Sequence, residues 1–242
     1  MIKRMPKPVD FGSCDFKWLD IKGYGRMLSY NSGCVHDQYE QIAYQPYIAW
    51  MTQSNKYDLF VDCGAYIGLY SFVAASHCKK VIAYEAAPFL FGILLFNMRF
   101  KKNVNCKYAW VGNKGQIPMQ KEEDFGTVTA GRLCEYNIPV VELDNEMIPF
   151  ITSYKNILIK MDIEGSELEA LKGCKELVKL PNVHWIIDVH KQSNVTHMDV
   201  LKFFRNRIVY SAPISNDVLV IKGTKDEAID PIFKGWTVIK LE

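Results

Sequence analysis

Short apolar runs recur along the chain from residue 57 onward, and stretches of helical length separate most of them. The runs lack the polar alternation of a strand with one solvated face, so they are typical of parallel strands that helices cover on both sides. The predicted strands are 59–61, 80–85, 103–111, 138–144, 156–162, 183–190, 208–210 and 218–221. The predicted helices are 69–75, 89–100, 145–150, 167–177 and 196–205. This alternation predicts a doubly wound α/β sheet.

The first 55 residues lack such a period and are predicted to form an N-terminal extension to a domain of residues 56–242. Gly23 and Gly25, followed by the run 26–30, indicate a short hairpin. We expect the extension to cover one side of a ligand cleft. A second irregular segment, 121–136, has the length of loops that often carry binding function.

The first apolar strand ends on Asp62 and passes into Gly64, Ala65, Tyr66 and Gly68. Glycine permits a sharp turn and close backbone approach, and the amides of a following helix would face a ligand. A dinucleotide fold places G-x-G-x-x-G here to seat a pyrophosphate, whereas this chain reads D-x-G-x-x-x-G. An acid at the strand end repels phosphate and suits the α-ammonium of a methionine moiety. The loop therefore favours S-adenosylmethionine over NAD, with a purely structural turn as the alternative.

The next strand ends on Glu85, about 20 residues after the glycines, which is the usual offset of a ribose-binding carboxylate. Ala86 follows it and is included in the predicted adenosine contact. Trp110 stands near the end of the third strand, where its ring would stack on an adenine. A tryptophan of the hydrophobic core explains the same position equally well.

Strand 156–162 repeats the opening pattern, because it also closes on a carboxylate, Asp162. Ser166 is predicted to cap the helix that follows. Asp162, Glu164 and His190 are the candidate catalytic groups at the strand ends, and His190 titrates nearest neutrality, so it is our hypothesised base. Asp162 and Glu164 are assigned to shaping the cofactor and acceptor site. A structural role for His190 is the alternative.

The composition and net charge of the chain argue against nucleic-acid binding, disulfide bonds and a membrane span. A formal charge of +2 without a polybasic tail gives little attraction for nucleic acid. The seven cysteines include no C-x-x-C pair, which predicts free thiols in a reducing, cytoplasmic setting. No apolar stretch reaches the roughly 20 residues of a membrane span. We predict no metal, although magnesium bound by Asp144, Asp162, Glu164 and Asp188 is an alternative.

Four motifs together resemble the FkbM family of S-adenosylmethionine-dependent methyltransferases. They are residues 61–68, 83–88, 140–144 and, most specifically, 158–167, which reads Lys-x-Asp-x-Glu-Gly-x-Glu from Lys160. The resemblance extends over roughly residues 56–192. It implies a class I methyltransferase fold, Rossmann-like, with a mostly parallel seven-stranded sheet whose last strand is antiparallel. It also implies O-methylation of a hydroxyl on a sugar, glycoconjugate or natural product. Ala87 departs from the polar residue that relatives commonly carry.

Two other functions stay open at this point. RNA ribose 2′-O-methyltransferases use a Lys-Asp-Lys-Glu set on the same fold, and Asp162 and Lys191 stand at suitable strand ends, but no acid follows the next strand, which closes at 210–213. A nucleotide-binding module without turnover would keep the same fold. The sequence makes no prediction of oligomeric state.

Overall fold

The structure is a computed structural model that describes residues 16–21, 23–30, 56–113, 138–190, 196–212, 218–224 and 233–240. Its strands are β1 (Phe16–Ile21), β2 (Gly25–Tyr30), β3 (Leu59–Cys63), β4 (Lys80–Glu85), β5 (Val104–Tyr108), β6 (Trp110–Val111), β7 (Val140–Val141), β8 (Ile157–Met161), β9 (Val183–Asp188), β10 (Arg207–Ser211), β11 (Val218–Thr224) and β12 (Thr237–Lys240). Its α-helices are α3 (Leu69–Ala74), α4 (Pro88–Met98), α5 (Leu143–Met147), α6 (Glu167–Lys172) and α7 (His197–Leu201). Short 3-10 turns follow at Ile151–Ser153, Leu177–Lys179 and Lys202–Phe204.

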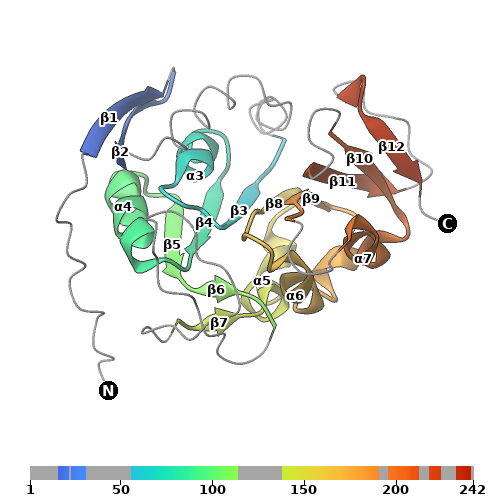
Figure 1. Ribbon diagram of the computed structural model, residues 1–242. Coiled ribbons are helices and arrows are strands. Elements are labelled where there is room, and N and C mark those ends of the chain that lie inside the picture. The colour runs from blue at the N-terminus through green and yellow to red at the C-terminus, as the bar shows by residue number, and fades with distance from the viewer. Residues whose placement is uncertain are drawn as a thin grey trace.

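The central sheet has the strand order β12-β10-β11-β9-β8-β3-β4-β5 (Figure 1). The pairs from β9 through β8, β3 and β4 to β5 are parallel, and β11 runs antiparallel to both β9 and β10. The mostly parallel sheet with an antiparallel late strand is thus confirmed. The predicted count of seven strands is wrong within the described residues, because the four-residue β12 adds an eighth strand at the β10 edge. That strand is too short for its apolar pattern to predict.

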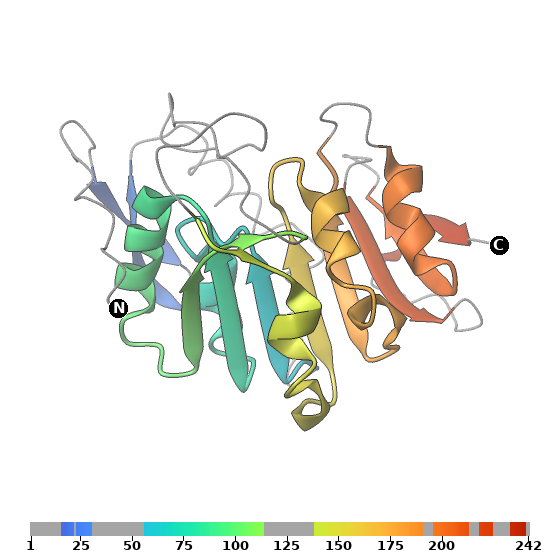
Figure 2. The ribbon, with the colours of Figure 1, turned by 90° about the horizontal axis from the view of Figure 1, so that it is seen from below.

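Helices cover both faces of the sheet, as the doubly wound prediction requires. Side chains alternate along a strand, so Phe60 of β3 packs with α3 and α4 while its neighbour Val61 packs with α5, α6 and α7. Figure 2 shows α5, α6 and α7 lying across one face of the sheet. β3 and β8 are buried at every position, which explains why their sequences lack polar alternation.

Three predicted elements differ from the structure. The third strand is split, since β5 ends at Tyr108 and β6 leaves the central sheet to pair with β7. The predicted strand 138–144 shrinks to the two residues of β7, because helix α5 begins at Leu143. The helix predicted over 167–177 ends at Gly173, where a Cβ would lie 2.6 Å from the carbonyl oxygen of Gly112. Gly173 is the C-cap residue of α6, and its close packing on Gly112 leaves no room for a side chain there.

The predicted N-terminal hairpin is confirmed as β1 and β2, an antiparallel pair. Asn97 of α4 joins it to the domain, because its Oδ1 accepts from the Leu28 N–H at 2.7 Å and its Nδ2 donates to the carbonyl oxygens of Leu28 and Ile67 at 3.0 and 2.8 Å. Most of the extension and the whole 121–136 segment lie outside the described residues, so covering of the cleft stays a prediction.

The cysteines at 63, 78, 106 and 174 are free thiols. Burial raises the pKa of Cys78 to about 12 and that of Cys106 to about 11, so both behave as small apolar side chains. Among the described helices, none has the length and apolar character needed to cross a bilayer.

Candidate active site

The carboxyl ends of four neighbouring parallel strands, β4, β3, β8 and β9, bring the predicted acids to one edge of the sheet. Asp62 of β3 is in register with Lys160 of β8, and Asp162 follows β8 directly. The ammonium of Lys160 lies 3.4 Å from an oxygen of Asp62 and 3.4 Å from an oxygen of Asp162. We call the residues gathered here the strand-end cluster; they are Asp62, Glu85, Lys160, Asp162, Glu164, Glu167, Asp188 and His190.

Asp62 is fully buried, and its two oxygens are held differently: Oδ2 is hydrogen-bonded, whereas Oδ1 has the charge of Lys160 near it but no hydrogen bond within the described chain. Its Oδ2 accepts a 2.7 Å hydrogen bond from the Ser71 hydroxyl of α3, and Lys160 faces its Oδ1. Burial raises the pKa of this carboxyl, and Lys160 and Ser71 oppose the rise. The side chain of Lys160 therefore stands where the sequence predicts the ammonium of the cofactor, so direct contact of Asp62 with the cofactor stays a prediction.

Lys160 is a buried member of the strand-end cluster to which the sequence-based assignment gave no role. Its Nζ also donates to the carbonyl oxygen of Gly64 at 3.2 Å and lies 4.9 Å from the ring centre of Tyr70. The signal was present, because Lys160 is the one charged residue inside the apolar run 157–161. A buried lysine in such a strand requires partners, and the structure supplies two carboxylates.

The glycine loop between β3 and α3 is shaped by protein contacts. Gly64 has φ +77°, and a Cβ there would lie 1.8 Å from the carbonyl oxygen of Asp162. Gly68 has φ +94°, and a Cβ there would strike Leu94 and Met98 of α4. The N–H groups of Gly64 and its successor Ala65 both donate to the carbonyl oxygen of Tyr84, at 3.1 and 2.9 Å, which holds this part of the loop against β4.

Glu85 fastens this loop to the end of β4. Its Oε2 accepts from the Tyr66 N–H at 2.7 Å, and its Oε1 accepts from the N–H groups of Ala86 and Ala87 at 2.9 and 2.8 Å. Burial raises the pKa of the Glu85 carboxyl to about 7, against the three N–H donors. Tyr66 adopts φ +54°, a left-handed backbone that this bond helps to hold. Ribose binding by Glu85 would add to these contacts and stays a prediction.

Trp110 is buried in a hydrophobic cluster, as expected of a core tryptophan, the alternative to adenine stacking. Its ring is 4% exposed and packs with Ile138, and Ala86, Tyr108 and Val140 contact the same cluster. The indole N–H is buried and has no hydrogen-bond partner within the described chain. Ala86 does lie beside the ring, so the two predicted adenine contacts are brought together, but stacking on the base stays a prediction.

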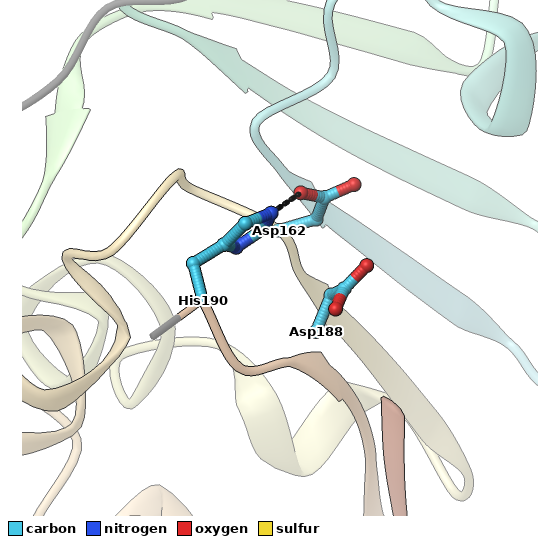
Figure 3. Close-up of side chains that lie close together, drawn as sticks. All are labelled: Asp162, Asp188 and His190. Atoms are coloured by element: carbon cyan, nitrogen blue, oxygen red, sulfur yellow. Dashed lines mark ion pairs between the residues drawn. The ribbon is translucent and has the colours of Figure 1, made fainter. Parts of the chain in front are cut away.

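His190 lies just after β9 and is surrounded by acids. Its Nε2 is 3.5 Å from Oε2 of Glu164 and 3.9 Å from Oδ1 of Asp162, and its Nδ1 is 3.1 Å from Oε1 of Glu167. Figure 3 shows the imidazole facing Asp162 with Asp188 beside them. The hydrogen bond to Glu167 raises the pKa of His190 to about 9, with support from the Glu164 and Asp162 charges and against desolvation.

The loop after β8 is strained at the residue that approaches His190. Glu164 adopts φ +51°, and Gly165 follows with φ +93°. A non-glycine residue in the left-handed region costs energy and occurs where the surroundings fix the backbone. Here the fixing contacts include Glu167, whose Oε1 accepts from the N–H groups of Ile163 and Gly165. Ser166, predicted to cap α6, makes no side-chain capping bond.

One ligand atom from each of Asp162, Asp188 and His190 lies within 4.8 Å of the others, near enough to share a cation. Lys160 already pairs with one oxygen of Asp162. Asp144 and Glu164, which the magnesium alternative includes, are not in this group, and the carboxylate of Asp144 accepts from the backbone N–H groups of Glu176 and Leu177. The absence of a bound metal stays a prediction.

The charge of the cluster suits a cationic ligand. The cluster contains six carboxyl groups, one lysine and one histidine. Burial raises the pKa of Asp188 to about 6, with the neighbouring Asp162 charge adding to the rise, so this carboxyl is still mostly ionised at pH 7. Anionic groups in a site of restricted solvent favour a positively charged ligand and repel phosphate. A sulfonium nucleoside meets that requirement, and the residues predicted to bind it lie at the same strand ends.

The RNA ribose 2′-O-methyltransferase alternative needs a Lys-Asp-Lys-Glu set. Lys191, the candidate for its second lysine, lies outside the described residues. The described end of β10, Tyr210 to Ala212, carries no acid that would complete the set.

The strand order, the glycine turn after β3 and the acids at the strand ends define a class I methyltransferase fold. The profile of the methyltransferase FkbM domain matches residues 62–208, more than half of the chain. The chain belongs to this family of S-adenosylmethionine-dependent methyltransferases, and its cofactor is S-adenosylmethionine. No curated protein sequence matches it.

Solved structures with a similar fold include the methyltransferase FkbM from Methylobacillus flagellatus KT, with 19% identity and a TM-score of 0.50 over 76% of this chain and 49% of that one. This chain thus spans about half the length of that relative. An rRNA methylase from Streptococcus thermophilus has 10% identity and a TM-score of 0.42 over 81% of this chain and 99% of that one. Fibrillarin from Aeropyrum pernix, with natively bound S-adenosyl-L-methionine, has 11% identity and a TM-score of 0.41 over 69% and 66%.

Proposed function

We propose that the protein transfers the methyl group of S-adenosylmethionine to a hydroxyl of a sugar, glycoconjugate or natural product. The observation that supports this best is the placing of His190 at the carboxyl end of β9, half-buried, with Nε2 directed toward Asp162 and Glu164. An alcohol needs a base to take its proton as it attacks, and an imidazole held at the strand ends is suited to that role.

The residues of the strand-end cluster have different roles in the proposed reaction. The cofactor supplies an electrophilic methyl group, and the chain must orient the acceptor hydroxyl and accept its proton. The Nε2 of His190 takes that proton. Asp162 and Glu164 stabilise the imidazolium that results, since both carboxylates lie within 4 Å of Nε2.

The same acids impose a condition on catalysis. Because the pKa of His190 is raised to about 9, the imidazole carries a proton at neutral pH and must lose it before it can act as a base. If Asp162 and Glu164 held the sulfonium cation of the cofactor, its charge would oppose protonation of His190 and lower the pKa of the imidazole. Cofactor binding is therefore expected to prepare the base.

Replacement of His190 tests the proposal. We expect His190→Ala to lower turnover at saturating acceptor by about 10²–10⁴-fold, the range for a general base, with S-adenosylmethionine binding retained in calorimetry. The matched control is His77→Gln, because His77 lies at the end of α3 and bonds Tyr24 at 3.0 Å, away from the cluster. A panel of glycans and nucleosides identifies the acceptor. Retention of most of the turnover by His190→Ala would show that His190 is not the base.

A further inference from the structure

Glu167 is a buried acid with no role in the methyl transfer proposed above. It is 1% exposed at the first residue of α6, while the neighbouring Glu169 has a half-exposed side chain paired with Lys172. A carboxyl group removed from water costs free energy unless its oxygens accept hydrogen bonds. The structure supplies these bonds from His190 and from the loop that follows β8.

The contacts of Glu167 meet on one oxygen. Oε1 lies 3.1 Å from Nδ1 of His190, 3.1 Å from the N–H nitrogen of Gly165 and 3.3 Å from that of Ile163. Glu167 thus joins the strained loop after β8 to the residue after β9. The separation along the chain between Glu167 and His190 is 23 residues, so only the parallel pairing of β8 with β9 brings them together.

We propose that Glu167 is a positioning residue that fixes the ring orientation and the tautomer of His190. A carboxylate accepts but does not donate, so the Nδ1 that faces it must carry hydrogen. Neutral His190 then has its lone pair on Nε2, which is the nitrogen directed toward Asp162 and Glu164. This inference rests on the proposed role of His190 as the base, because it explains how that base would present the correct nitrogen.

The remaining charged groups around His190 do not serve this purpose. Glu164 and Asp162 face Nε2 at 3.5 and 3.9 Å, which is longer than the 3.1 Å contact of Nδ1 with Glu167, so they hold a hydrogen on Nε2 less well. Asp188 of β9 lies beside the ring. Lys160 of β8 interacts with the other oxygen of Asp162. Among the described groups that face His190, Glu167 alone contacts Nδ1, so the choice of tautomer depends on it.

The tautomer is measured directly in the unmodified protein. Nitrogen-15 NMR of the imidazole, recorded with the full chain above the pKa of His190, is expected to show hydrogen on Nδ1 and none on Nε2. The His190 signal is assigned by its loss in His190→Gln. Hydrogen on Nε2 would overturn the proposal, and no variant of Glu167 is needed for this result.

Glu167→Gln then separates positioning from a structural role. The amide oxygen still accepts from Ile163, Gly165 and Nδ1, so the fold and cofactor binding are expected to persist, but the negative charge is removed. We expect the pKa of His190 to fall by about one unit or more, as for loss of a charged hydrogen-bond partner. The limb of the activity profile that reports His190 should move to lower pH by the same amount. On the plateau above that pKa, kcat should fall by about threefold, because a less basic imidazole takes the acceptor proton less readily, with the acceptor KM little changed. Glu169→Gln on the same helix is the control and should change neither the profile nor kcat.

A double-mutant cycle with His190→Ala distinguishes the two proposals. If Glu167 acts through His190, the kcat loss caused by Glu167→Gln disappears when His190 is already alanine. An equal loss in both backgrounds would overturn the positioning role while leaving the base in place. Full activity of His190→Ala would overturn the base, and the positioning role in catalysis with it, even if the NMR tautomer is as expected.

Discussion

Lys160→Met tests the electrostatic basis of the whole strand-end cluster. Lys160 is 5% exposed and Asp62 is fully buried, so removal of the ammonium leaves a carboxylate without its counter-ion in the interior. Methionine has nearly the length of the lysine stem and creates little cavity. The effect of the substitution is therefore mainly the loss of charge.

The expected loss in the free energy of unfolding follows from the least costly way to neutralise the unpaired carboxylate of Asp62. Asp62 can take up a proton, which costs about 1.4 kcal/mol for each pH unit between the solution pH and its ordinary pKa of 3.8. At pH 7 this sets an upper limit of about 4 kcal/mol, because the raised pKa of Asp62 means that the native protein already bears part of this cost. Breaking a buried ion pair costs about 3–5 kcal/mol. With a urea m value of about 3 kcal/mol/M, the unfolding midpoint falls by about 1–2 M.

The pH dependence gives the sign of the effect. Burial holds the folded-state pKa of Asp62 above its unfolded value, and loss of Lys160 raises it further. A group with a raised folded pKa binds its proton more tightly in the folded state, so the variant regains stability relative to the native protein as pH falls. Two pH units correspond to about 2.7 kcal/mol, and most of the deficit at pH 7 should be gone by pH 5.

Urea unfolding at pH 7 and pH 5, followed by circular dichroism, measures both quantities. Lys172→Met is the control, because Lys172 forms an exposed pair with Glu169 and should cost less than about 0.5 kcal/mol. The double variant Asp62→Asn with Lys160→Met should recover most of the loss, since no charge is then stranded. A deficit below 1 kcal/mol at pH 7, or one equal at both pH values, would refute the reasoning.

Three further outcomes are expected. Gly64→Ala should abolish S-adenosylmethionine binding in calorimetry and lower the melting temperature, since there is no room for a Cβ at this position. Gly92→Ala in α4 is the control, because a Cβ there meets no atom within 4 Å, and it should stabilise the folded protein by about 0.5–1 kcal/mol. Asn97→Ala should cost about 1–3 kcal/mol and speed hydrogen exchange at the Leu28 amide; unchanged exchange would mean that other contacts hold the hairpin. For the free enzyme, kcat/KM should rise tenfold per pH unit to a plateau near pH 9, the value for His190, and a flat profile would contradict the assignment.

Much of the fold was predictable because its strands are buried on both faces. The apolar runs that form β3, β4, β8 and β9 can be recognised from the local sequence alone. Each ends on or next to a polar residue of the strand-end cluster. The failures lie at β6, β7 and β12, which are too short for periodicity to show. Their pairing is decided by neighbours distant in sequence.

The sequence by itself determined the class of fold, the positions of the acids at the strand ends and the glycine turn between them, because these are local properties of chain composition and spacing. Only the tertiary structure decided which groups meet. It turned Asp62 toward Lys160, placed Gly64 against the backbone of Asp162 and set Glu167 beside His190. Those pairings join separate strands across the sheet, and the free energy that selects them, the desolvation of buried charge, exists only once the chain has folded.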